Sequence, residues 1–416
     1  MPEGRPPLLS LDEALVRLVA GAEAARIAET ETLSTFDALG RVLAADVVSA
    51  IDVPPADNSS MDGYALRVAD TATAGVLLPI SQRIPAGSVG QALAAGTAAR
   101  IFTGAQVPAG ADAIVMQEHC EAVDGGVRVN TVPQPGQWIR RRGEDVPIGA
   151  TVLARGLRLT PQALGLAAGV GAATLSVCRR PRVALFSTGD ELVMPGALAP
   201  ADLPPGAIYN SNRFTLRGLL QAAGCEVIDL GIVPDRLDAT REALRCAAAA
   251  NDLILSSGGV SVGEEDHIKP AVAAEGRIEM WQVAIKPGKP LAFGAVRRQA
   301  GGEALFIGLP GNPVSSFVTF LLAVAPVLRA MQGLPPALPA ALPMPAHFDW
   351  PRPDKRREFL RVRRSGGGGL DLFANQSSGV LTSAVWADGL VDNPPGRAIA
   401  RGDVVSYLPL ASLVGH

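Results

Sequence analysis

The chain has 416 residues, with 37 Lys and Arg against 40 Asp and Glu, so its formal net charge is −3. Hydrophobic residues make up 48% and charged residues 19%, which excludes a disordered chain, and at roughly 100 to 200 residues per domain the length predicts several domains. The balanced charge offers no broad basic surface to nucleic acid or to an anionic membrane.

The four cysteines, Cys120, Cys178, Cys225 and Cys246, stand far apart, with no CxxC pair and no histidine at metal-ligand spacing. We expect reduced thiols in a cytoplasmic protein. The N-terminus lacks a basic region followed by an apolar run, so no signal peptide is predicted. The most apolar stretches, 164–177 and 317–328, are glycine-broken or too short to span a bilayer, which needs about 20 apolar residues.

The first part of the chain changes character twice. Ser10 and Glu13 form a capping box, and apolar residues at helical spacing follow, so a helix is predicted to begin there. From 51 to about 142, short apolar runs broken by Pro, Gly and Asp indicate a small β-rich unit. Mixed segments return over 143–178, where Pro161 can open another helix.

From Arg182 onward, predicted strands alternate with predicted helices. This order favours a largely parallel, doubly wound sheet with helices on both faces, and such sheets bind ligands at the carboxyl ends of their strands. The predicted strands are 183–187, 225–233, 252–259 and further runs within 278–296 and 304–311, and the predicted helices are 210–224, 238–251 and 313–333.

A proline-rich segment, 334–353, marks a domain boundary. Beyond it lie short alternating segments such as REFLRVRR and DVVSYLPL, with GGGG at 366–369 as a hairpin tip and 381–391 as a candidate helix. A small β-barrel or sandwich fits this pattern.

Two predicted strands end in loops that combine glycine with acidic and hydroxyl side chains. The hydroxyls and free N–H groups of the first loop suit an anion, and its carboxylates suit a hard cation. In the second loop, glycines would let the backbone approach a phosphate; the alternative is a tight turn followed by a solvated helix start. These loops are Ser187, Thr188, Gly189, Asp190 and Glu191, and the stretch 256–266 with Ser257, Gly258, Gly259 and Asp266.

Two further loops could hold anions. Lys286 and Lys289 lie in AIKPGKP, where prolines stiffen the backbone and two compact cations suit a tetrahedral oxyanion. GLPGNPVS, with Pro310 and Pro313, leads from a strand into a helix whose first N–H groups could bind an anion. The alternatives are a hairpin turn with solvated lysines and an ordinary capped helix.

Common enzyme motifs give little support to two other classes. The sequence contains no GxxxxGK[ST], which argues against a Walker-type ATPase. GVSVG at 259–263 has the GxSxG spacing, but the chain has only four histidines to serve as a base, which disfavours a serine hydrolase. Of the four histidines, only His267 lies in a candidate loop. Residue chemistry alone therefore indicates an anion-binding α/β domain for phosphate or oxyanion chemistry assisted by a divalent metal.

The stretch PPADNSSMDGYALR (54–67) resembles the molybdenum insertases of the MoeA type, whose eukaryotic relatives include the E domain of gephyrin. Other motifs follow in the family's order and cover most of the chain. They are FTGAQVPAGADAIVMQE (102–118), RRGEDVPIGA (141–150), FSTGDEL (186–192), IYNSNRFTL (208–216), SGGVSVGEEDHIK (257–269), AIKPGKPLAFG (284–294), GLPGNPVSSF (308–317) and REFLRV (357–362).

The resemblance implies a multidomain α/β plus β fold and a homodimer whose active site lies between one subunit's pterin-binding domain and the other's N-terminal parts. The expected domains are a discontinuous elongated domain, 8–50 and 143–178; an inserted β-rich domain, 51–142; a MogA-like α/β domain, 179–334; and a C-terminal β-barrel, 335–416.

The implied reaction inserts molybdenum from molybdate into adenylylated molybdopterin and releases AMP, assisted by Mg²⁺ or a similar cation. Expected partners are the adenylyltransferase that makes the substrate and molybdoenzyme acceptors, with neither nucleic acid nor membrane. An adenylyltransferase of molybdopterin is the alternative enzyme, distinguished by ATP consumption without molybdate. A gephyrin-like scaffold is the alternative from another class, distinguished by unchanged cofactor synthesis after deletion of the gene.

By the match, site residues come from all parts of the chain. Asp190, Glu191 and Asp266 are expected at the metal, with Asp235 beside the pterin. Lys286 and Lys289 would bind molybdate next to Pro310 and Pro313. The C-terminal domain would add Ser377, Ser378 and Arg357, with the adjacent Arg356 as the alternative register. The partner subunit would add Asp62, Thr103 and Asp145.

Overall fold

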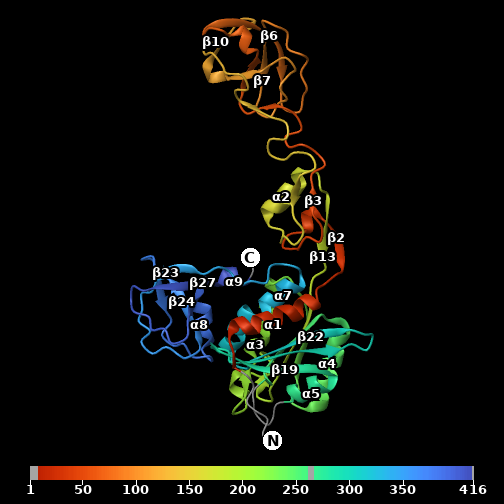
Figure 1. Ribbon diagram of the computed structural model, residues 1–416, viewed down its shortest axis with the longest axis vertical. Helices are drawn as coiled ribbons and strands as arrows, with labels where there is room; N and C mark the ends of the chain where they lie inside the picture. Colours follow the sequence, from red (N-terminus) through yellow and green to blue (C-terminus); the bar gives the residue numbers. More distant parts are fainter. Residues whose placement is uncertain (1–7, 261–266, 415–416) are drawn as a thin grey trace. The chain divides into compact units, whose positions relative to one another are not determined.

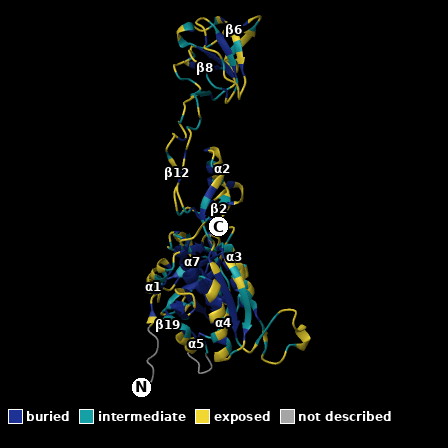
Figure 2. Cartoon of the chain, turned by 90° about the vertical axis from the view of Figure 1, so that its right-hand side faces the viewer, coloured by how far each residue is buried: buried dark blue, intermediate teal, exposed yellow. Residues whose placement is uncertain are grey.

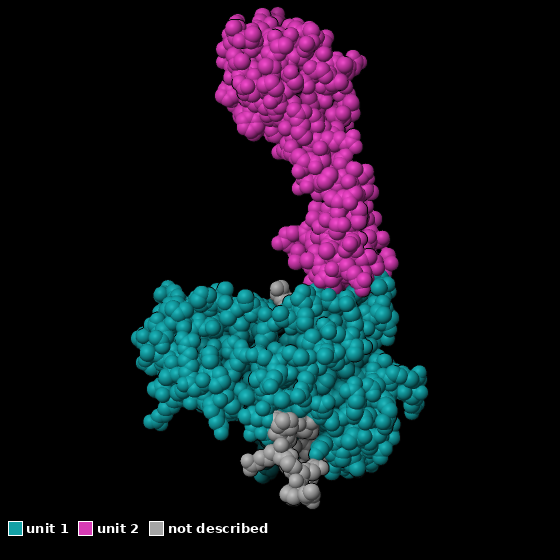
Figure 3. Space-filling model, viewed as in Figure 1, with its two compact units in different colours: residues 1–31, 178–416 teal, residues 32–177 magenta. Residues whose placement is uncertain are grey.

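The computed structural model describes residues 8–260 and 267–414, and the chain divides into two compact units (Figure 3). Unit 1 comprises residues 1–31 and 178–416, and unit 2 comprises residues 32–177. Each unit has hydrophobic cores of its own.

Unit 1 is built on a seven-stranded sheet in the order β1, β19, β21, β22, β18, β14, β17 (Figure 1). Four neighbouring strands, β22, β18, β14 and β17, run parallel to each other, as the alternating pattern predicts. The strands are β1 (Leu8–Leu9), β14 (Arg182–Thr188), β17 (Glu226–Val233), β18 (Leu253–Ser257), β19 (Gly276–Val283), β21 (Pro290–Arg297) and β22 (Glu303–Leu309).

The remaining half of this sheet departs from the largely parallel order that the sequence predicts. Strand β21 is antiparallel to both β19 and β22. The chain between Val283 and Pro290 contains no helix, and a parallel return needs a crossover of about a dozen residues or more. The short connection therefore folds these strands into antiparallel neighbours, with the two lysines of AIKPGKP in the turn.

Helices cover both faces of the sheet because its strands are apolar on both sides. In β14, Val183 and Leu185 pack into one core while Ala184 and Phe186 pack into the other. Figure 2 shows these strands buried under helices whose outer faces are exposed. The first core is covered by α1 (Leu11–Ala24), α3 (Ser211–Ala222), α6 (Pro313–Thr319) and α7 (Ala325–Met331), and the second by α4 (Leu237–Ala250) and α5 (Ile268–Glu275).

Helix α1 begins as predicted. Ser10 Oγ accepts a hydrogen bond from the Glu13 N–H, and a Glu13 carboxylate oxygen accepts one from the Ser10 N–H, which completes the capping box. The buried Leu11, Ala14 and Leu18 attach this helix to the α/β sheet of unit 1. The resemblance places this helix in the discontinuous domain, 8–50 and 143–178, whereas in the structure it belongs to unit 1.

One helix of the described residues, Pro313–Met331, is long and apolar enough to cross a membrane, with a mean hydropathy of 1.8 over its best window. Its apolar centre, 317–328, is by itself too short to span a bilayer, as the sequence predicts. The helix is continuous because α6 and α7 are joined by a π-helical turn, Phe320–Val324. Since 89% of the window is buried, it serves as the central core helix of unit 1.

The C-terminal part of unit 1 forms a separate six-stranded sheet. The glycine-rich tip at 366–369 joins two antiparallel strands, β24 and β25, as predicted. Strand β20 (Ile285–Lys286), which belongs to the α/β sequence, pairs with β24 and places Lys286 opposite Glu358. The other strands are β23 (Leu342–Pro345), β24 (Arg357–Arg364), β25 (Leu370–Leu372), β26 (Gly389–Asn393) and β27 (Val404–Pro409).

Unit 2 contains the predicted β-rich part as a six-stranded sheet in the order β8, β5, β7, β6, β10, β9. Tyr64 and Leu66 pack on one face of this sheet and Ala65 on the other. A further core surrounds α2 (Pro161–Gly169), which begins at the predicted Pro161. The sheet strands are β5 (Gly63–Leu66), β6 (Val76–Ile84), β7 (Ala98–Ile101), β8 (Ala113–Met116), β9 (Cys120–Val123) and β10 (Gly126–Val129).

These sheets and helices confirm the predicted fold class, a multidomain α/β plus β protein. The four domain boundaries of the sequence analysis stay a prediction.

Candidate functional site

A cavity of about 840 Å³ opens in unit 1 where the parallel strands end. Four strands supply it at their carboxyl ends: β17 through Asp235, β14 through Thr188, β18 through Ser257 and β22 through Pro310. Ligands of open α/β sheets bind at this edge, and the volume suits a ligand larger than a single oxyanion.

The glycines on this edge are required by close packing. Gly258 and Gly259 have φ values of +92° and +65°, and a Cβ on Gly258 would stand 2.5 Å from the Thr188 carbonyl oxygen. The Asn212 amide donates to Ser257 Oγ at 2.8 Å and to the Gly311 carbonyl at 2.7 Å. Together these contacts fix the ends of three neighbouring strands against each other.

Buried hydroxyl groups without a partner lie beside this wall. Ser187 Oγ, Thr188 Oγ1 and Ser256 Oγ are buried and have no hydrogen-bond partner among residues 8–260 and 267–414. Buried polar groups are normally satisfied, so an unpartnered hydroxyl on a residue of the cavity wall favours a polar ligand. Of the three, only Thr188 lines the cavity, and a hydroxyl there can donate a hydrogen bond to a phosphate oxygen.

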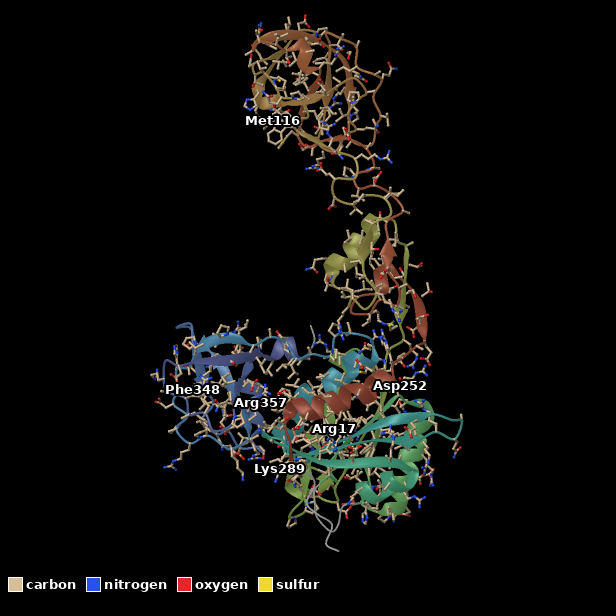
Figure 4. The ribbon with its side chains drawn as sticks, in the orientation of Figure 1. Arg17, Met116, Asp252, Lys289, Phe348 and Arg357 are labelled. Atoms are coloured by element: carbon tan, nitrogen blue, oxygen red, sulfur yellow. The ribbon has the colours of Figure 1, made fainter. Side chains whose placement is uncertain are left out.

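The opposite wall is cationic. Lys286, Lys289 and Arg356 line the cavity. Lys286 Nζ lies 3.3 Å from the buried Glu358 carboxylate and 3.5 Å from that of Asp354, while Arg356 binds Asp354 at 2.9 Å. These bonds hold two of the three cations in place before any ligand arrives. Lys289, labelled in Figure 4, has no ion pair within the described parts of the chain.

Glycine also shapes the turn between the two lysines. Gly288 has a φ of +108°, and a Cβ there would meet Thr319 Oγ1 at 2.3 Å. The turn therefore rests directly on helix α6, and the close contact is possible only without a side chain.

The carboxylates expected at a metal are only partly on the cavity wall. Glu191 and Asp235 line the cavity, and Asp190 does not. Asp266 lies outside the described residues. No group of three His, Cys, Asp or Glu side chains within 8–260 and 267–414 could hold a metal ion by itself.

The C-terminal domain contributes Arg356, Gln376, Ser377 and Ser378 to the cavity. Arg357, expected there from the motif, does not line it: its guanidinium binds the Asp392 carboxylate with two hydrogen bonds of 2.6 Å. The cation at the cavity is the preceding residue, Arg356, because β24 begins at Arg357 and the chain turns just before it.

Most of the residues expected in unit 1 are brought together, and some functional candidates were missed. Asn212, Asn312, Ser315 and Gln376 line the cavity without having been expected, and Arg356, the alternative to Arg357, lines it as well. Asn212 stands within the motif IYNSNRFTL, a signal that could have found it. The expected lining residues are Thr188, Gly189, Glu191, Asp235, Ser257, Gly258, Gly259, Lys286, Lys289, Pro310, Pro313, Ser377 and Ser378, whereas Ser187 lies behind the wall.

The three candidates of unit 2 have local partners of their own. Asp62 accepts hydrogen bonds from the backbone N–H and the hydroxyl of Thr103, both at 2.8 Å. These bonds lower the pKa of the Asp62 carboxyl. Asp145 is exposed, and its N–H donates to the Val53 carbonyl.

Comparisons with known proteins cover nearly the whole chain. Family models match at residues 9–171 (MoeA N-terminal region, domains I and II), 184–330 (probable molybdopterin binding domain) and 343–410 (MoeA C-terminal region, domain IV). A molybdopterin molybdenumtransferase of Haemophilus influenzae is 38% identical over 394 residues, covering 93% of this chain and 95% of that protein.

Two further relatives agree with this match. Molybdopterin molybdenumtransferase 2 of Mycobacterium tuberculosis is 40% identical over 390 residues, covering 90% of this chain and 93% of that protein. A crystal structure of the molybdopterin biosynthesis moeA protein from Pyrococcus horikoshii has a TM-score of 0.83 at 29% identity, covering 96% of this chain and 99% of that one. The chain therefore belongs to the MoeA family, as its motifs predicted.

Proposed function

We propose that this chain is a molybdopterin molybdenumtransferase, a transferase that inserts molybdenum from molybdate into adenylylated molybdopterin and releases AMP. Its relatives in Haemophilus influenzae and Mycobacterium tuberculosis carry that name. The observation that carries the proposal is the composition of the cavity. One wall offers glycines and hydroxyls, and the other offers Lys286, Lys289 and Arg356. Such a cavity can hold a phosphorylated pterin and a separate oxyanion side by side.

The glycine wall is the proposed place of the pterin and its phosphates. Thr188, Ser257, Gly258 and Gly259 present hydroxyl or backbone groups there. Hydrogen bonds from fixed donors stabilise phosphate oxygens without rearrangement of the protein. Water adds to a phosphorus atom of the phosphoanhydride, the P–O bond breaks, and AMP leaves.

The cationic wall is the proposed place of molybdate. A tetrahedral dianion needs positive charge and hydrogen-bond donors from several directions. Lys286 reaches the cavity from β20, and Lys289 reaches it from the turn that follows this strand. Arg356 comes from the C-terminal domain, whose Ser377 and Ser378 add hydroxyls. The two dithiolene sulfurs of the pterin would bond to molybdenum in this position, and the molybdate oxygen that they displace would leave as water with the two thiol protons.

We also propose Mg²⁺ or a similar divalent cation as cofactor. Mg²⁺ is usually bound through one or two carboxylates together with substrate phosphates, and Glu191 and Asp235 on the cavity wall fit that requirement. Asp190 and Asp266 stay proposed as further ligands. When bound, the cation neutralises charge that develops on the phosphate oxygens. Glu191 lies against Gly189, where a Cβ would come within 2.6 Å of its carboxylate.

A homodimer is proposed as the working form, with Asp62, Thr103 and Asp145 of unit 2 completing the partner's site. Unit 2 carries an open apolar groove of about 660 Å³ whose rim includes Phe36, which is 92% exposed. Exposed apolar grooves of this kind favour contact with another protein surface. A second copy of the chain is the proposed occupant. Proposed further partners are the molybdopterin adenylyltransferase and molybdoenzyme acceptors, with a cytoplasmic location.

The test is AMP release from adenylylated molybdopterin, measured with and without molybdate and Mg²⁺, beside reconstitution of a molybdenum-dependent apoenzyme. We expect molybdate-dependent AMP release and an active reconstituted enzyme. Arg356→Ala should lose activity, and Lys355→Ala, which changes an exposed cation outside the cavity, is the matched control. Substrate binding without turnover by the wild type would instead favour a carrier or scaffold.

A further inference from the structure

A buried arginine stands behind the cationic wall of the cavity. The Arg361 side chain on β24 is 1% exposed and does not line the cavity. Its guanidinium donates to Ser383 Oγ at 3.2 Å, to the Phe359 carbonyl at 3.2 Å and to the Ser377 carbonyl at 3.3 Å. These acceptors are all neutral, and no carboxylate of the described residues pairs with this side chain.

A buried cation without a counter-charge is unfavourable for folding. Burial lowers the pKa of Arg361 to about 10, so the guanidinium remains charged at neutral pH. Buried charges are normally paired, and an apolar side chain in the same place often gives an equally stable or more stable protein. Phe359 and Val362, on the same strand, show that buried apolar side chains fit in this part of the core. The charge of Arg361 therefore calls for a reason other than packing.

The contacts of Arg361 fix the conformation of the segment 376–378. The Gln376 amide accepts from the Arg361 N–H at 2.9 Å and donates to the Arg361 carbonyl at 3.0 Å. The Ser377 carbonyl is turned toward the guanidinium, and the Ser378 carbonyl accepts from the Val314 N–H in the first turn of α6 at 3.0 Å. Both serine carbonyls are thus engaged away from the cavity.

This arrangement decides which groups the segment offers to a ligand. Ser377 and Ser378 line the cavity, and within the described ranges their hydroxyls form no hydrogen bond with the protein. A carbonyl oxygen turned toward an oxyanion would repel it, whereas a hydroxyl can donate to it. Holding the carbonyls back converts the segment into an anion-binding wall.

We propose that Arg361 is a positioning residue for the oxyanion half of the cavity. It turns the Ser377 carbonyl away from an incoming tetrahedral dianion, and it places a positive charge behind the wall that the bound dianion balances. The inference rests on the proposed function in naming molybdate as that dianion.

The test compares Arg361→Gln and Arg361→Lys with the wild type in the full-length protein. Titration calorimetry with sodium molybdate should show an affinity about tenfold to a hundredfold lower for Arg361→Gln. Arg361→Lys keeps the positive charge but not the three hydrogen bonds of the guanidinium, so its molybdate affinity should lie between those of Arg361→Gln and the wild type. In the AMP-release assay the KM for molybdate should rise while kcat at saturating molybdate and the KM for the adenylylated pterin are retained. Arg363→Gln, which removes an exposed cation from the same strand, should bind molybdate as the wild type does.

Three results would overturn the inference: unchanged molybdate affinity in a folded Arg361→Gln variant, equal losses for molybdate and for the pterin, or the same loss in Arg363→Gln. If Arg361→Gln does not fold, Ser383→Ala decides, because it removes the acceptor of Arg361 Nε and keeps the arginine, at the further loss of one hydrogen bond from Ser383 Oγ to the Val380 carbonyl. That variant should bind molybdate more weakly than the wild type, and an unchanged affinity would refute the role of Arg361. A wild-type protein that binds no molybdate would count against the proposed function itself.

Discussion

Gly288→Ala should disable the molybdate side of the cavity while leaving the parallel sheet intact. Gly288 lies between Lys286 and Lys289 with a φ of +108°, a conformation that residues with a Cβ rarely adopt. The new methyl group would also stand 2.3 Å from Thr319 Oγ1, a buried atom that cannot move aside without disturbing the core helix.

The cost has two parts. A left-handed conformation costs a residue with a Cβ roughly 1 to 2 kcal/mol, and overpacking a close contact costs about 1 to 3 kcal/mol. If the turn stays in place, the unfolding free energy should fall by about 2 to 5 kcal/mol. If the turn moves to relieve this strain, Lys286 and Lys289 move with it and molybdate binding is lost. We expect part of the strain to remain and part to be relieved by movement of the turn. The Tm should therefore be lower, and the molybdate affinity should fall by at least about tenfold.

Thermal unfolding and molybdate titration on the same preparation measure both effects. Gly218→Ala in helix α3 is the control, because a Cβ there meets no atom within 4 Å and its φ is not positive. Alanine in a helix is more favourable than glycine by up to about 1 kcal/mol, so this control should be neutral or slightly stabilised. Wild-type Tm together with wild-type molybdate affinity in Gly288→Ala would refute the reasoning.

Three more predictions concern the cations of the same wall. Combined Lys286→Ala and Lys289→Ala substitutions should weaken molybdate binding far more than binding of the adenylylated pterin; equal losses in calorimetry would assign the lysines to the phosphate. Arg356→Ala should weaken molybdate binding more than Arg357→Ala, because only Arg356 lines the cavity, and the reverse order would restore the motif-based assignment. Hydrogen bonds from Arg356 hold the pKa of Asp354 far below its ordinary value of 3.8, so its stabilisation is complete above that pH and disappears as the pH falls toward the lowered pKa. Asp354→Asn should therefore have a lower Tm than the wild type at neutral pH, with the difference shrinking in acid; a constant difference across the pH range would contradict this.

The local pattern of the sequence determined the elements on either side of the cavity. Strand β14 could be recognised because it is apolar on both faces, helix α1 because Ser10 and Glu13 cap it, and the turn at Gly258 because its glycines follow a buried strand. Each of these features depends on residues that are neighbours in the chain, so a short window contains the whole cause. The reaction itself was inferred from the family motifs, because composition and spacing led only to phosphate or oxyanion chemistry.

The tertiary structure alone decided how distant segments meet. Lys286 and Glu358 are 72 residues apart in the chain, and only the pairing of β20 with β24 sets them side by side. The same pairing directs Arg356 to the cavity and Arg357 to Asp392. A shift of one residue turns a side chain to the other side of a strand, so the register between β20 and β24, two segments far apart in the chain, decides which side chains share a side. The sequence therefore predicted which loops form the site, and the pairing of β20 with β24 decided which cations face the cavity.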